Sequence, residues 1–98
     1  MPSSIKTPVT LRGLQDYVAS QKSSKRKDKR KYFLKLIEEV GELAEMINSD
    51  QRWETSKAQD IKHTMEEELA DVLFYIAALA NVYEIDLEQS FTKKETIR

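Results

Sequence analysis

Two stretches of this chain decide its fold: KLIEEVGELAEMI at residues 35–47 and MEEELADVLFYIAALA at residues 65–80. In both, apolar residues recur every three or four positions, which is the spacing of one face of an α-helix. Each stretch also carries two acids three positions apart, so both members of a pair leave the same side of their helix. These acids are Glu39 and Glu42 in the first stretch, and Glu68 and Asp71 in the second.

Asp71 is the most informative of the four acids. It is the only charged residue between Leu69 and Tyr83. An ionised carboxylate that is buried without a partner costs several kcal/mol, so it normally pairs with a cation or binds a metal. That helix contains no basic residue to act as the partner. A divalent cation held between the two acidic pairs would meet the requirement.

Glu39 also occupies an unusual position for a solubilising residue. The apolar stripe of its helix is expected to consist of Leu36, Val40, Leu43 and Ile47. At about 100° of rotation per residue, Glu39 falls on the border of that stripe. Glutamate is common on exposed helix faces, so an EExxE string alone is weak evidence. Together, however, the four acids offer only oxygen ligands, which favours Mg²⁺ or Mn²⁺ over zinc.

Other catalytic and metal sites are excluded by residue type. A di-iron carboxylate bundle needs a Glu-x-x-His motif on each of two helices, whereas the single histidine, His63, is preceded three positions earlier by Asp60. The chain has no cysteine, which removes disulfides, thiolate metal sites and cysteine nucleophiles.

Composition predicts one small protein of the cytoplasm. The 98 residues carry a formal net charge of −1, which argues against a generic nucleic-acid binder or a polybasic membrane protein. The apolar run 69–83 is shorter than the roughly 20 residues that span a bilayer. The first residues lack the apolar core of a secretory signal.

An all-α fold is expected, because both prolines lie within the first eight residues and only two glycines occur. A flexible lead-in, 1–9, would precede one domain, 10–98. Helix-capping residues mark the starts of three helices: Thr10, Thr64 (with Glu67 completing a capping box) and Asp86. The four expected helices span about 11–22, 29–48, 64–83 and 87–96, with the two long ones antiparallel.

The third expected helix is apolar around most of its circumference, which is typical of a central, buried helix. A chain of this size exposes too much of such a helix when it is alone. We therefore expect a homodimer or tetramer in which a second copy completes the helical bundle.

Seven basic residues lie between positions 22 and 31. They fit a solvated linker and helix start. They also fit a rim that attracts an anionic substrate, since clustered Lys and Arg raise its local concentration.

The motif Glu38-Glu39-x-x-Glu42, followed after 25 residues by Glu68-x-x-Asp71, resembles the EExxE…ExxD signature of the MazG-like, all-α nucleoside triphosphate pyrophosphatases. The likeness covers about residues 10–95. It implies Mg²⁺-dependent hydrolysis of a nucleoside triphosphate to the monophosphate and pyrophosphate, as in house-cleaning of dNTPs or non-standard nucleotides. Mn²⁺ can replace Mg²⁺ chemically, and the relatives form dimers or dimers of dimers.

The resemblance also implies roles for individual residues. The metal ligands would be Glu39, Glu42, Glu68 and Asp71, and either Glu38 or Glu42 would orient or deprotonate the attacking water. Tyr75 matches a residue that lines the nucleotide pocket in dCTP pyrophosphatase-like members, and Lys94 matches a basic residue near the phosphates. Relatives continue beyond that lysine with Asn and a basic tail, whereas the present sequence reads KKETIR.

Three further hypotheses come from the residues themselves. Trp53, in the polar connection 49–63, has a ring large enough to stack on a base. A catalytically silent helical oligomerisation module of the same fold is the alternative to an enzyme. A nucleic-acid adaptor that uses residues 22–31 is a weaker option, and its signature would be salt-sensitive binding.

Overall fold

The computed structural model describes residues 5–21, 25–49 and 64–97, and within these ranges it contains helices and no strand. The elements are α1 (Leu11–Gln21), the short 3₁₀ helix η1 (Arg26–Asp28), α2 (Lys29–Ser49), α4 (Met65–Val82) and α5 (Leu87–Thr96). The expected all-α class and the four expected helices are confirmed.

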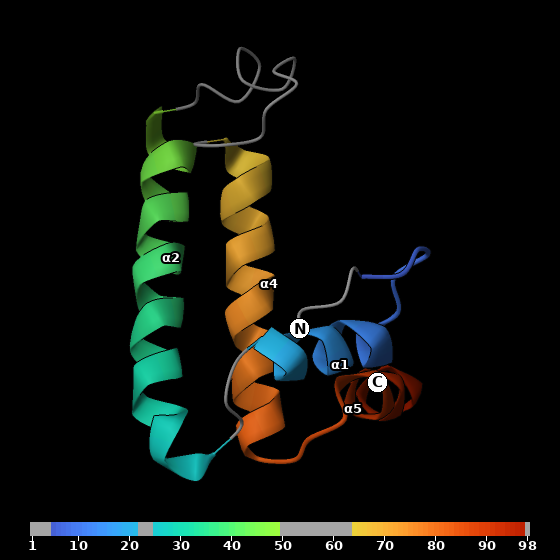
Figure 1. Ribbon diagram of the computed structural model, residues 1–98. Helices are drawn as coiled ribbons and strands as arrows, with labels where there is room; N and C mark the ends of the chain where they lie inside the picture. Colours follow the sequence, from blue (N-terminus) through green and yellow to red (C-terminus); the bar gives the residue numbers. More distant parts are fainter. Residues whose placement is uncertain (1–4, 22–24, 50–63, 98) are drawn as a thin grey trace.

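The two long helices form an antiparallel hairpin. Figure 1 shows α2 and α4 side by side and running in opposite directions, and α2 and α4 share the most extensive contact between elements. The helix α1 packs against the C-terminal half of α4, and α5 lies against α1 at the foot of the hairpin. One half of the hairpin is therefore packed against α1, while the other half extends beyond it.

The three expected N-caps are confirmed by hydrogen bonds. The hydroxyl of Thr10 accepts from the backbone N–H of Gly13 at 2.9 Å, and the hydroxyl of Thr64 accepts from that of Glu67 at 3.3 Å. The carboxylate of Asp86 accepts from the backbone N–H of Gln89 at 3.0 Å. Such bonds satisfy amide groups that a helix start leaves without an internal partner.

The apolar core lies where α1, the start of α2 and the second half of α4 meet. Its buried members are Val18, Tyr32, Ala77, Ala78 and Val82. The two alanines allow the other helices to approach α4 closely because their side chains are small. The Tyr32 ring lies 6.5 Å from that of Tyr75, at the end of the core that faces the middle of the hairpin.

One buried polar side chain ties α1 to the last two helices. Gln15 is 1% exposed. Its amide nitrogen donates to Asn81 Oδ1 at 2.9 Å and to the Ile85 carbonyl at 2.7 Å, and its oxygen accepts from the Leu87 N–H at 2.8 Å. Asn81 Nδ2 donates to the Gln15 carbonyl at 2.9 Å. The network leaves the end of α4 and the start of α5 joined to α1.

The apolar side of α2 divides into two neighbouring stripes. Tyr32 and Glu39 belong to the stripe that faces α4, with half-buried Leu36, Leu43 and Met46 at the same spacing. The second stripe is exposed, so two residues expected in the packed stripe, Val40 and Ile47, lie outside the hairpin. The exposed stripe consists of Phe33, Ile37, Val40, Ala44 and Ile47.

The helix α4 has a matching exposed stripe, and it is not buried on all sides within one chain. Its large apolar members are Leu69, Leu73, Ile76 and Tyr83, each between about one third and one half exposed. The residues of both stripes recur at intervals of three and four positions, which is the spacing of the contact residues of helices that pack in bundles. No described helix is both long and apolar enough to cross a membrane.

Candidate metal centre

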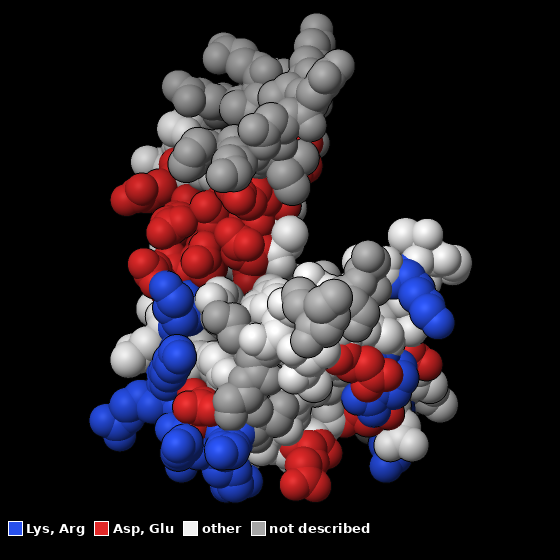
Figure 2. Space-filling view, in the orientation of Figure 1, with Lys and Arg blue, Asp and Glu red and all other residues white. Residues whose placement is uncertain are grey.

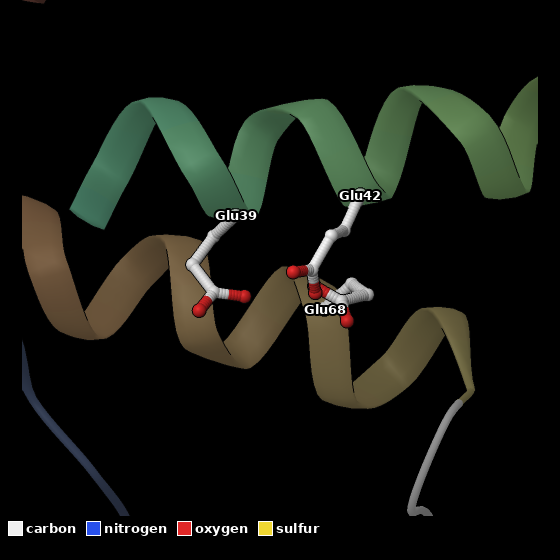
Figure 3. A group of neighbouring side chains, drawn as sticks. All are labelled: Glu39, Glu42 and Glu68. Atoms are coloured by element: carbon white, nitrogen blue, oxygen red, sulfur yellow. The ribbon is translucent and has the colours of Figure 1, made fainter. Parts of the chain in front are cut away.

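Three glutamates from the two hairpin helices meet between α2 and α4. Glu39 and Glu42 project from α2 toward Glu68 on α4 (Figure 3), and each offers one carboxylate oxygen within 4.8 Å of the others. The spacing of three residues places Glu39 and Glu42 one above the other on their helix. The antiparallel hairpin then places Glu68 against both.

Glu68 is the most buried of the three. It is 8% exposed, and its Oε2 atom is buried without a hydrogen-bond partner. Burial, followed by hydrogen bonds with Glu39 and Glu42, raises the pKa of Glu68 from 4.5 to about 7. Two carboxylates can share a hydrogen bond only when one of them holds a proton, which explains why these contacts favour the protonated form.

The same environment raises the pKa of two more acids, Glu39 and Asp71. Burial is the largest cause that raises the pKa of Glu39, with the charges of Glu42 and Asp71 acting in the same direction. Burial, then the charges of Glu67 and Glu42, raises the pKa of Asp71. Asp71 lies one turn beyond Glu68 on α4, and its carboxylate is outside the group of three. All these shifts show that negative charge accumulates here in a partly dehydrated place.

The arrangement fits a hard divalent cation. Mg²⁺ binds oxygen at about 2.0–2.1 Å, so two ligands on opposite sides of it lie about 4.2 Å apart. The three carboxylate oxygens lie within a comparable distance of one another. A cation there would give the unpartnered Oε2 of Glu68 a partner and offset the accumulated negative charge.

Glu38 faces the outside of this cluster, where it pairs with a lysine. Lys35 Nζ lies 3.2 Å from Glu38 Oε1. The hydrogen bond to Glu38, and then the charges of Glu38 and Tyr75, raise the pKa of Lys35. Lys35 was not among the site residues predicted from the sequence. Its position three residues before Glu38, on the same helix face, could have predicted that it lies beside the acidic motif.

The remaining expected site residues differ in their placement. Tyr75 is half-buried and lies four residues after Asp71 on α4. Its ring packs edge-on against that of Phe74, with 5.4 Å between the ring centroids. Lys94 is exposed on α5, at the foot of the molecule and away from the hairpin cluster of its own chain (Figure 1). Trp53 and His63 lie outside the described residues.

Charge is segregated along the hairpin. Figure 2 shows acidic side chains gathered on the upper part of the hairpin and basic ones directly below them on the same face. These basic side chains come from the N-cap of η1, from η1 itself and from the first half of α2, and they include the described part of the basic run. They are Lys25, Arg26, Lys27, Lys29, Arg30, Lys31 and Lys35.

The segment that contains this hairpin matches one protein family. A family model, described as the MazG nucleotide pyrophosphohydrolase domain, matches residues 27–98. The chain belongs to the MazG family. The matched segment includes the last two residues of η1, both hairpin helices and α5, and therefore all the candidate site residues.

Solved MazG structures have the same fold. Two crystal structures of iMazG from Vibrio DAT 722, Ntag-iMazG and Ctag-iMazG, are each 35% identical to this chain, with TM-scores of 0.77 and 0.75. The alignments cover 91% of this chain and 93% and 97% of those chains. A 56-residue segment is 43% identical to the uncharacterized protein YpjD of Bacillus subtilis (strain 168). That segment spans 57% of this chain and half of the length of YpjD.

Proposed function

We propose that this MazG-family chain is a Mg²⁺-dependent nucleoside triphosphate pyrophosphohydrolase. It would convert a (d)NTP and water to the (d)NMP and pyrophosphate, and so clear surplus or non-standard nucleotides from the cytoplasm. The observation that carries the proposal is the meeting of Glu39, Glu42 and buried Glu68 inside the hairpin. Family membership supports the reaction class.

The same three glutamates would hold the metal, with Asp71 as a fourth ligand. Electrostatic interactions of Asp71 with Glu39 and Glu42 support its inclusion. A bound Mg²⁺ would offset phosphate charge and lower the pKa of a coordinated water. Mn²⁺, which prefers similar ligands, would be a substitute.

The protein side chains have separate tasks in the proposed reaction. Glu38 or Glu42 would orient the attacking water and accept its proton. The water oxygen bonds to the α-phosphorus, and the bond from that phosphorus to the α–β bridging oxygen breaks. Pyrophosphate leaves with the bridging oxygen and its electron pair, and the monophosphate retains the new oxygen.

The nucleotide would lie beside Tyr75, whose position next to the charged cluster supports a role in the pocket. Base stacking by Trp53 and phosphate binding by Lys94 complete the proposed substrate contacts. Because α5 is at the foot of its own chain, Lys94 would serve the cluster of another copy.

We further propose that residues 10–98 form one domain that assembles as a homodimer, or as a tetramer built from such dimers. The exposed stripes of α2 and α4 support this assembly, because together they form one apolar face along the outside of the hairpin. A second hairpin on that face would complete a four-helix bundle.

The deciding experiment is product analysis with a panel of nucleotides. With Mg²⁺ and a dNTP, we expect the monophosphate and pyrophosphate in equal amounts. Glu39→Gln and Asp71→Asn should nearly abolish turnover, and Glu45→Gln, which changes an exposed acid on α2 outside the cluster, should not. A nucleoside diphosphate with inorganic phosphate would instead identify a phosphatase. No turnover from a correctly assembled protein would identify the silent oligomerisation module.

A further inference from the structure

We propose that Lys35 is the cation that binds the departing pyrophosphate end of the substrate. This inference rests on the proposed function and adds a residue that the acidic motif does not contain. It assigns to Lys35 a task that the carboxylates cannot perform, namely direct contact with negatively charged phosphate oxygens.

The position of Lys35 at the edge of the acidic cluster carries the proposal. Lys35, Glu38 and Glu42 are spaced three and four residues apart, so they follow one another along the same face of α2. The amine is 3.2 Å from Glu38 Oε1, and its charge also interacts with Tyr75 and Glu39. Lys35 therefore contacts the acidic motif and is near enough to Tyr75, the aromatic residue proposed to border the nucleotide, to interact with it electrostatically.

The exposure of Lys35 suits a ligand-binding role. Its side chain is 45% exposed and that of Glu38 is 53% exposed, so the amine can leave its partner without opening the hydrophobic core. Exposed pairs of this kind contribute little to stability. A lysine ammonium on a flexible stem also acts as a mobile point charge that can reach the phosphate oxygens of a bound substrate.

Charge balance supports the same assignment. A triphosphate carries about four negative charges, and the proposed metal ligands add four more, so one divalent cation leaves a large excess of negative charge. Of the described Lys and Arg residues, Lys35 is the one that shares a helix turn with the acidic motif. The rest of the basic side chains on α2 begin one turn earlier and continue away from the cluster (Figure 2).

The test compares wild type with Lys35→Gln, Lys35→Arg and Lys6→Gln. Lys6→Gln removes the same charge from the exposed segment before α1, which contains none of the proposed site residues. We expect Lys35→Gln to raise KM for the dNTP at least tenfold with kcat changed less than threefold. The Kd for Mn²⁺–pyrophosphate, measured by calorimetry, should rise by a similar factor. Lys35→Arg should restore most of the wild-type KM and of the wild-type pyrophosphate Kd, and Lys6→Gln should match wild type in both.

A melting curve with Mn²⁺ separates phosphate binding from metal binding. Lys35→Gln should retain the wild-type gain in Tm on adding Mn²⁺, because Lys35 is not a ligand. Loss of that gain, or wild-type values of both KM and the pyrophosphate Kd in Lys35→Gln, would overturn the assignment. Wild-type protein that binds Mn²⁺–pyrophosphate but turns over no nucleotide would refute the proposed reaction alone, and the calorimetric comparison would still decide the role of Lys35.

Discussion

Glu68 shows what a single residue contributes to this site and why its depth could not be predicted. The sequence singled out Asp71, because it is the lone charge in an apolar run, and placed Glu68 beside it on the same helix face. Periodicity gives the direction of a side chain but not its depth, which depends on the partner helix. In the structure Glu68 is the more deeply buried acid, and Asp71 is half-buried.

The raised pKa of Glu68 predicts that metal-free protein loses stability as pH rises. The folded protein holds a proton on Glu68 up to about pH 7, whereas the unfolded chain releases it near 4.5. Between these values the folded state binds more protons, so the free energy of unfolding falls as pH rises and the loss is complete above pH 7. At about 1.4 kcal/mol for each pH unit, the loss is a few kcal/mol at most.

Urea unfolding in a chelating buffer from pH 5 to pH 8 measures this effect. Glu68→Gln should remove the largest part of the fall, and the raised pKa values of Glu39 and Asp71 should account for what is left. Mn²⁺ should stabilise wild type more at pH 7.5 than at pH 5.5, because metal and protons compete for the same oxygens. The control Glu45→Gln should behave as wild type. Parallel curves for wild type and Glu68→Gln would refute the prediction.

At the scale of the elements, capping residues predicted more than periodicity did. Thr10, Thr64 and Asp86 marked three helix starts that hydrogen bonds confirm, because a cap acts through residues that are close in sequence. Periodicity could not decide which of two adjacent stripes on α2 faces α4. Leu36 and Val40 satisfy the same spacing rule, and only the packed partner distinguishes them.

Gln15 was missed because it is polar, although it lies between Leu11 and Val18 at the spacing of one helix face. We expect Gln15→Leu to lower the free energy of unfolding by about 3 kcal/mol. The variant removes the partly buried hydrogen bonds to Asn81 Oδ1, the Ile85 carbonyl and the Leu87 N–H. A buried polar group that loses its partner costs about 1–3 kcal/mol, and partial exposure lowers that cost. Denaturant unfolding measures the change, with exposed Gln89→Leu as the control. Equal losses in both variants would mean that the network contributes no specific stability.

For the whole molecule, the sequence predicted the all-α fold because the motif, the caps and the helix lengths all agree. The sequence predicted the exposed apolar face only indirectly, because the expected helix 64–83 has too few polar residues to be surrounded by water. The structure supplies the position of that face on α2 and α4. That surface supports the proposed assembly.

We expect wild type to elute at twice the 11.4 kDa chain mass or more at micromolar concentration in chromatography with light scattering. The double variant Ile37→Glu, Leu73→Glu should be a monomer, because it places charges in the middle of both exposed stripes. Phe91→Glu changes an apolar residue on α5 that is more exposed than Ile37 or Leu73 and lies outside both stripes, so this variant should retain at least the dimer. A monomeric wild type would contradict the proposed assembly.

The separation of acids and bases along the hairpin makes each copy an electric dipole, although its net charge is only −1. Two copies that meet with their hairpins antiparallel would place the positive end of each near the negative end of the other. Their long-range fields would then largely cancel, and the attraction would favour one relative orientation before any apolar contact forms. Dissolved ions screen such fields beyond about 10 Å at 0.1 M, so ionic strength would act first on the orientation in which two copies meet.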